Sequence, residues 1–133
     1  MADPGREPAA GPLGILLLSG GHERAHYAFV LACGAAATGR AVTLFATSEG
    51  CRALAADWSG VGEAGRDARV RAAGVAGLGE LRDAARELGV RLMACEAGLR
   101  IVGLDAAALL PGVEVAGVPT WLSAGKGGQL VSL

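Results

Sequence analysis

Five short apolar runs separated by helix-like stretches limit what this chain can fold into. The first run, Leu13 to Ser19, is almost continuously apolar, as expected for a strand that is covered on both faces. Strands that alternate with helices build a parallel sheet between two helical layers. We therefore expect an α/β fold, a three-layer α/β/α domain around a five-stranded, mostly parallel sheet. Its strands should begin near Leu13, Ala41, Val90, Val113 and Gln129.

The length and the composition fit one domain. The chain has 133 residues, 52% of them hydrophobic, which is enough for a core without disulfides. Residues 1–12 are rich in Pro and Gly and predict a flexible tail, so the single domain spans residues 13–133. Within it, residues 58–77 combine glycines and charges with little apolar periodicity. That stretch predicts a flexible loop.

Charge and cysteine usage exclude several classes of function. The net charge is −1 and no basic stripe is present, so nucleic acid is not an expected partner. No stretch reaches the roughly 18 apolar residues that a membrane span needs. The N-terminus does not resemble a secretory signal, and an odd number of cysteines suggests a reducing compartment. We expect a cytoplasmic protein.

Cys95 is the strongest candidate for a reactive residue. It directly follows the predicted strand Val90–Ala94, and a helix-like stretch starts at Glu96. The carboxyl edge of a parallel sheet is where ligands and reactive groups collect, and the positive end of a helix favours a thiolate. Glu96 partly cancels that field. The alternative is that Cys95 packs as a small hydrophobic side chain.

The turns after the other strands should surround Cys95 at the same edge of the sheet. Among them, His22 has a side chain that titrates near neutral pH and could carry a proton. Cys51 and Trp121 could face this pocket or could simply pack in the core. The pocket candidates are Ser19, Gly20, Gly21, His22, Ser48 (also the expected N-cap of a short helix), Cys51, Glu96, Thr120 and Trp121.

Two further sets of residues have structural interpretations. His22 and His26 are four residues apart, but no third histidine or nearby carboxylate pattern completes a metal motif. We expect no metal. Cys33 lies inside a predicted helix over residues 24–38, where we expect it to be buried and unreactive.

Three segments give the chain a family resemblance. They are Gly-Arg-Ala-Val-Thr-Leu-Phe-Ala-Thr at 39–47, Glu-Leu-Gly-Val-Arg-Leu-Met-Ala-Cys at 87–95, and Leu-Leu-Pro-Gly-Val-Glu-Val-Ala-Gly-Val-Pro-Thr-Trp-Leu at 109–122. With these segments the chain resembles the DsrE/DsrF-like proteins of sulfur relay, in particular the branch labelled DsrE-like or peroxiredoxin-like.

The resemblance implies a role for Cys95. In that family, a cysteine after the central strand accepts sulfane sulfur as a persulfide, and Cys95 is the matching residue. The resemblance also implies a sulfur donor or acceptor protein as partner, and a homotrimer or hexamer. No cofactor is expected. The branch usually has a methionine-rich segment after this cysteine, whereas residues 96–104 contain no methionine.

Two other functions remain open from the sequence. Cys51 and Cys95 could form a thiol–disulfide couple in a redox protein. Alternatively, the chain could be a non-catalytic ligand-binding or assembly module with an inert Cys95.

Overall fold

A five-stranded sheet forms the centre of the computed structural model, which describes residues 11–133. All paired strands run parallel, in the order β4-β3-β2-β1-β5. The predicted fold class is therefore confirmed, and each strand begins within one residue of its expected start. The strands are β1 (Leu13–Leu17), β2 (Val42–Ala46), β3 (Arg91–Cys95), β4 (Glu114–Ala116) and β5 (Gln129–Ser132).

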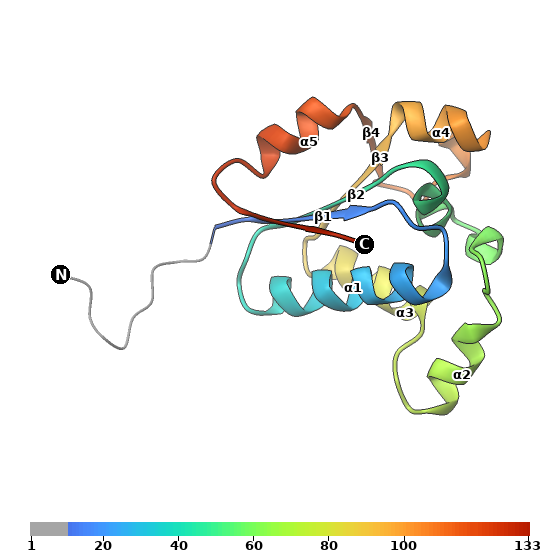
Figure 1. Cartoon of the computed structure of the whole chain (residues 1–133). Helices are drawn as coiled ribbons and strands as arrows, with labels where there is room; N and C mark the ends of the chain where they lie inside the picture. The colour runs from blue at the N-terminus through green and yellow to red at the C-terminus, as the bar shows by residue number, and fades with distance from the viewer. Residues whose placement is uncertain (1–10) are drawn as a thin grey trace, which may run out of the picture.

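Helices cover both faces of the sheet (Figure 1). Two of them, α1 (His22–Ala37) and α3 (Leu78–Glu87), lie side by side against one face. On the opposite face lies α5 (Val118–Ala124), which begins with a proline in its first turn, as expected. The remaining helices are α2 (Arg66–Ala72), α4 (Glu96–Val102) and the short 3₁₀ segments η1 (Ser48–Leu54), η2 (Trp58–Gly60) and η3 (Ala106–Ala108).

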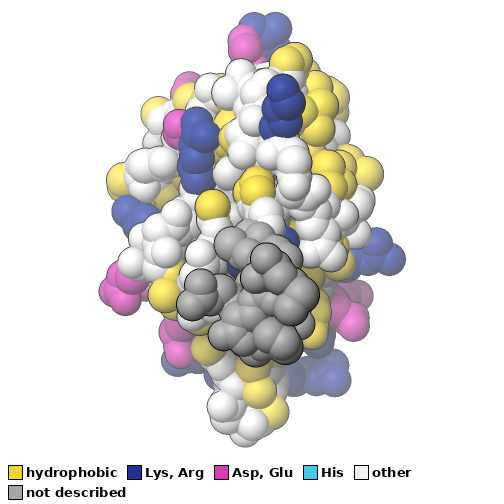
Figure 2. Space-filling view, turned by 90° about the vertical axis from the view of Figure 1, so that its left-hand side faces the viewer, with side chains coloured by type: hydrophobic (Ala, Val, Ile, Leu, Met, Phe, Trp, Pro, Cys, Tyr) yellow, Lys and Arg dark blue, Asp and Glu magenta, His cyan; other side chains and the backbone are white. Residues whose placement is uncertain are grey.

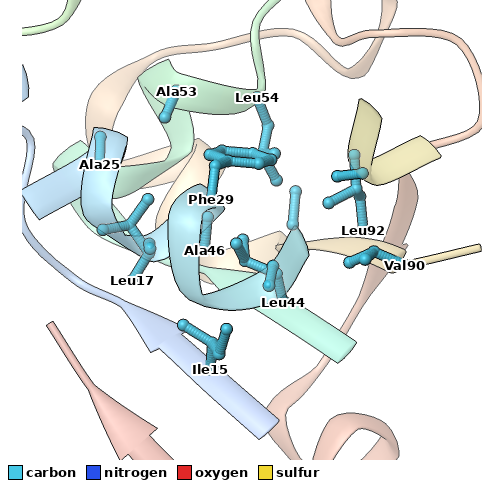
Figure 3. Packing of buried hydrophobic residues seen from close by; sticks show 14 of the residues in the cluster. Ile15, Leu17, Ala25, Phe29, Leu44, Ala46, Ala53, Leu54, Val90 and Leu92 are labelled. Carbon is cyan, nitrogen blue, oxygen red and sulfur yellow. The ribbon is translucent and has the colours of Figure 1, made fainter. Parts of the chain in front are cut away.

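The main core lies between the sheet and the α1/α3 layer. Alternate residues of β1, β2 and β3 point toward this layer and pack around Phe29 of α1, which is fully buried (Figure 3). Burying one side chain of this size stabilises the fold by about 1.5–3 kcal/mol. A smaller cluster of Phe45, Met93 and Trp121 fills the space under α5. Apolar residues on both faces explain why the strands are almost continuously hydrophobic.

The stretch over residues 58–77 contains more regular structure than we expected. It holds η2 and the two-turn helix α2. Its sequence shows no apolar periodicity because α2 has one buried residue, the polar Asp67, instead of an apolar stripe. The flexibility of this segment stays a prediction.

The expected N-cap at Ser48 is wrong. Thr47 occupies the cap position, and Ser48 lies one residue inside η1 with a positive φ of 50°. The turn brings Gly50 directly against the carbonyl of Leu17. The short helix expected after Ser48 is a 3₁₀ segment, η1.

No helix within residues 11–133 is long and apolar enough to cross a membrane. The view from the side of the strands' amino ends shows positive and negative side chains scattered among hydrophobic ones (Figure 2). The described residues form no continuous basic surface on this face.

The close approach at Gly50 gives the first prediction. Gly50→Ala should destabilise the fold by about 1–3 kcal/mol, because the added methyl group has to displace the Leu17 carbonyl in a packed core. Gly34→Ala is the matched control: it lies in α1, and no neighbouring atom lies within 4 Å of the added carbon. That change should stabilise by about 0.5–1 kcal/mol. Urea unfolding measures the change in the free energy of unfolding of each variant. Equal changes would contradict the close packing of Gly50 against Leu17.

Candidate functional site

Cys95 ends β3 and caps α4. Its Sγ accepts the backbone N–H of Gly98 at 3.4 Å, so the sulfur occupies the N-cap position of the helix. The side chain is half-buried and packs on the cluster of Phe45, Met93 and Trp121. A sulfur atom held in this way is oriented by the backbone while part of its surface is open to solvent.

Glu96, the next residue, turns toward the helix and away from this cap. Its carboxylate accepts from Nη2 of Arg100 at 2.8 Å, one turn further along α4. The pair is exposed, so its contribution to stability is small. The guanidinium nevertheless offsets the carboxylate charge that we expected to oppose a thiolate at Cys95.

Cys51 lies in the neighbouring turn but is fully buried. Its S–H donates to the carbonyl of Ala46 at 3.5 Å. Burial, with the nearby charge of Cys95 as a smaller cause, raises the pKa of the Cys51 thiol from 9.0 to about 11. The two thiols therefore share the carboxyl edge of the sheet in different environments. Cys51 stays protonated near neutral pH.

Arg82 of α3 holds the end of the turn that carries Cys51. Its buried guanidinium donates to the carbonyls of Ala53 and Ala55 from Nη1, and to the carbonyl of Ala56 from Nη2 at 3.2 Å. The Ala53 carbonyl lies in the last turn of η1, and the other two follow it directly. Sequence analysis missed this residue because a charged side chain on an amphipathic helix is normally solvated.

The turns after β1, β2 and β3 pack closely against one another. A Cβ on Gly98 would lie 2.5 Å from the backbone nitrogen of Ser48 and 2.7 Å from Oγ1 of Thr47. A Cβ on Gly20 would lie 2.6 Å from the Cβ of Glu49. These contacts leave no room for larger residues, so the Cys95 turn sits directly on the Ser48 turn, and the Gly20 turn lies beside it.

Ser19 and Gly21 form the start of the β1–α1 turn. The Ser19 hydroxyl accepts the N–H of Gly21 at 3.2 Å, and Gly21 forms an isolated parallel bridge with Gly62. The β1–α1 turn therefore contacts the 58–77 segment through Gly62, in addition to lying at the edge of the sheet.

His22 points to α2. Its Nε2 lies 2.7 Å from Oδ1 of Asp67, and Arg66 donates from Nη1 to Nδ1 at 3.2 Å. Because arginine can only donate, Nδ1 accepts, and Nε2 carries the proton given to Asp67. Both ring nitrogens are thus engaged by residues of the 58–77 segment. Sequence analysis could not identify Asp67 or Arg66, since no short motif links positions 44 or 45 residues apart.

Asp67 completes this buried network by accepting the N–H of Leu78 at 2.8 Å, where α3 begins. Burial would raise the pKa of Asp67, but the Leu78 N–H and His22 outweigh it and lower the pKa below its usual range. The carboxylate is therefore charged at neutral pH.

His26 fastens the same segment at a second point. Its Nε2 donates to the carbonyl of Ala76 at 2.8 Å, and its ring stacks on that of His22 with centroids 5.5 Å apart. Within residues 11–133, no group of three His, Cys, Asp or Glu side chains is placed to hold a metal ion. The two histidines, one helical turn apart, both bind residues of the 58–77 segment and hold it against α1.

Trp121 is a core residue. Its ring stacks on Phe45 with centroids 5.1 Å apart, and its Nε1 donates to Oγ1 of Thr43 at 3.0 Å. The indole is 3% exposed and shares its cluster with Cys95, whereas the neighbouring Thr120 is exposed.

Cys33 packs on the edge of the main core, whereas Cys95 packs on the cluster of Phe45, Met93 and Trp121 on the other face of the sheet. It is partly buried, and its S–H donates to the carbonyl of Leu81 at 3.4 Å. Burial raises the pKa of this thiol.

These environments predict the order in which the cysteines react. Burial raises the pKa of Cys33 and raises that of Cys51 to about 11, so little of either thiol is ionised near pH 8. Iodoacetamide should therefore label Cys95 first, and Cys33 and Cys51 much more slowly. Peptide mapping of a labelling time course measures the three rates. Faster labelling of Cys33 or Cys51 would show that Cys95 is the wrong choice.

Comparisons with known proteins agree with this architecture. A model of the DsrE/DsrF/DrsH-like family matches residues 54–130, more than half of the chain and including Cys95. No curated protein sequence matches the chain.

Two solved structures share the fold. The ychN protein from E. coli has a TM-score of 0.69 at 15% identity, over 92% of this chain and 99% of the other. MTH1491 from Methanobacterium thermoautotrophicum, a protein of unknown function, has a TM-score of 0.56 at 20% identity with the same coverage. At these identities the likeness concerns the fold alone. The family is shown by the family model, which matches more than half of the chain and covers the central cysteine strand: the chain belongs to the DsrE/DsrF/DrsH-like family.

Proposed function

We propose that the protein is a sulfur-relay protein in which Cys95 accepts sulfane sulfur and passes it on as a persulfide. The observation that carries the proposal is the position of Cys95 as the half-buried N-cap of α4. A persulfide carrier needs a thiol that is open to a partner and supported by hydrogen-bond donors. Family membership supports the same class of function.

The chemistry requires only thiol groups. The Cys95 thiolate attacks the outer sulfur of a donor persulfide, a new S–S bond forms, and the donor's S–S bond breaks. The donor leaves as a thiolate, and the sulfur remains on Cys95. An acceptor thiolate then removes it by the same exchange, so no net oxidation occurs and no metal is needed. In the attacking form of Cys95, the N–H of Gly98 faces Sγ, the atom that carries the thiolate charge.

The burial of Cys51 protects such an intermediate. A neighbouring thiolate would attack the inner sulfur of the persulfide, form a disulfide and release hydrogen sulfide. With a pKa of about 11, Cys51 is almost entirely protonated near neutral pH and is a poor nucleophile. This environment favours sulfur transfer over the thiol–disulfide couple of Cys51 and Cys95.

We also propose that the chain assembles into a homo-oligomer, a trimer or a hexamer. Support comes from apolar side chains left uncovered on the α5 side of the sheet. Leu122 of α5 and Leu130 of β5 line the same small hollow and are 51% and 53% exposed. Contiguous apolar surface of this kind marks interaction sites. The sulfur donor or acceptor protein would approach Cys95 at the carboxyl edge.

Sulfur loading tests the proposed chemistry. After treatment with polysulfide, mass spectrometry should find the mass of one additional sulfur atom on the Cys95 peptide. Cys95→Ser should abolish this loading with the fold intact, because serine is close to cysteine in size. Cys33→Ser is the matched control and should load normally. Loss of two hydrogens between Cys51 and Cys95 would instead indicate a redox couple, and an unmodified Cys95 would indicate a non-catalytic module.

Light scattering tests the assembly. The wild-type chain should show a mass about three or six times its 13.2 kDa at micromolar concentrations. Leu130→Glu should dissociate it, because a charge on the proposed contact would be desolvated. Leu88→Glu changes a similarly exposed leucine at the end of α3 and should leave the mass unchanged. A monomeric wild-type protein would contradict this proposal without affecting the sulfur-loading result.

A further inference from the structure

A cavity of about 360 Å³ lies between α1 and α2, separate from the Cys95 turn. Its size falls within the range of small-molecule sites. The polar side chains that line the cavity come from both helices. The apolar side chains come from α2 and from the turn that follows it. The residues that matter are His26, Tyr27, Arg66, Arg69, Val70 and Val75.

Two arginines give the cavity an excess of hydrogen-bond donors. Arg66 uses one guanidinium nitrogen for His22, and neither Arg66 nor Arg69 forms an ion pair within residues 11–133. The carboxylate of Asp67, next to Arg66 in α2, is occupied by His22 and the Leu78 N–H. Neither guanidinium group therefore has a carboxylate partner among residues 11–133. A planar guanidinium group can donate two parallel hydrogen bonds to two oxygens of one carboxylate or phosphate.

The position of Arg66 is set in advance by the buried network. Its contact with His22, which in turn contacts Asp67, ties the guanidinium to the start of α3. Ordering a free arginine on binding costs conformational entropy, and a residue that is already held loses less. The buried His22 therefore holds the guanidinium group of Arg66 in place at the cavity.

Another part of the cavity lining is apolar. Val70 and Val75 line the cavity, and Val75 is 50% exposed although it is a large aliphatic residue. Tyr27, which is 54% exposed, offers a ring and a hydroxyl on the α1 side. A ligand that contacts both the arginines and the apolar side chains has to combine an anionic group with an apolar group.

We propose that this cavity binds a small organic oxyanion, a carboxylate or a phosphate ester with an apolar group. Arg66 and Arg69 bind the oxyanion, while Val70 and Val75 contact the apolar part. The site is independent of sulfur transfer at Cys95.

Calorimetric titration of the full chain with phenyl phosphate, benzoate and inorganic phosphate tests the proposal. Phenyl phosphate or benzoate should bind more tightly than inorganic phosphate, which lacks the apolar group. A preference for phenyl phosphate would assign a phosphate ester, and a preference for benzoate a carboxylate. Arg69→Gln should weaken binding about tenfold, as expected for one charge-assisted hydrogen-bonded contact.

Arg71→Gln is the matched control. Arg71 lies on the same helix but pairs with Glu80 instead of lining this cavity, so its loss should change the affinity less than about twofold. Thermal unfolding checks that both variants are folded. No binding of any of the three probes, or equal weakening by the two substitutions, would overturn the proposal. Cys95→Ser should bind like the wild type, which separates this test from the sulfur-loading result.

Discussion

The close backbone packing of three successive turns at the carboxyl edge is the constraint on which the rest of this structure depends. Parallel pairing of β1, β2 and β3 delivers their ends to the same edge. Gly20, Gly50 and Gly98 then let the turns approach to distances that a side chain would prevent. The helix that Cys95 caps, α4, begins directly against the Ser48 turn. The chemistry of the site therefore rests on backbone proximity more than on neighbouring functional groups.

The same edge separates two thiols by their degree of burial. Cys51 and Cys95 follow adjacent parallel strands, yet one is fully enclosed and the other is half-buried. The sequence placed both near this edge, with Cys95 as the stronger candidate and Cys51 as either a pocket or a core residue. The difference arises because η1 folds back under the α4 turn, and Arg82 satisfies the carbonyls that this fold leaves open.

The sequence was sufficient for the sheet and for the position of Cys95, because strand-length apolar runs and their endings are local signals. It was not sufficient for the partners of His22. The contact with Asp67 spans 45 residues, and the segment that supplies Asp67 has no apolar pattern that would place it. Trp121 remained ambiguous for a similar reason, since its partner Thr43 lies 78 residues away. Side-chain contacts across the fold need the tertiary arrangement.

The two attachments of α3 have a consequence for how the molecule opens. At its start, the Leu78 N–H is bonded to Asp67, and further along Arg82 is bonded to the end of η1 and to the residues that follow it. Local opening of either segment would leave a buried donor, the Leu78 N–H or the Arg82 guanidinium, without its partner. Such a loss costs about 1–3 kcal/mol, and more for the charged group. Small independent fluctuations are thereby suppressed in both places. Amides of α3, η1 and the 58–77 segment should then exchange as one cooperative unit, although these segments share no continuous secondary structure.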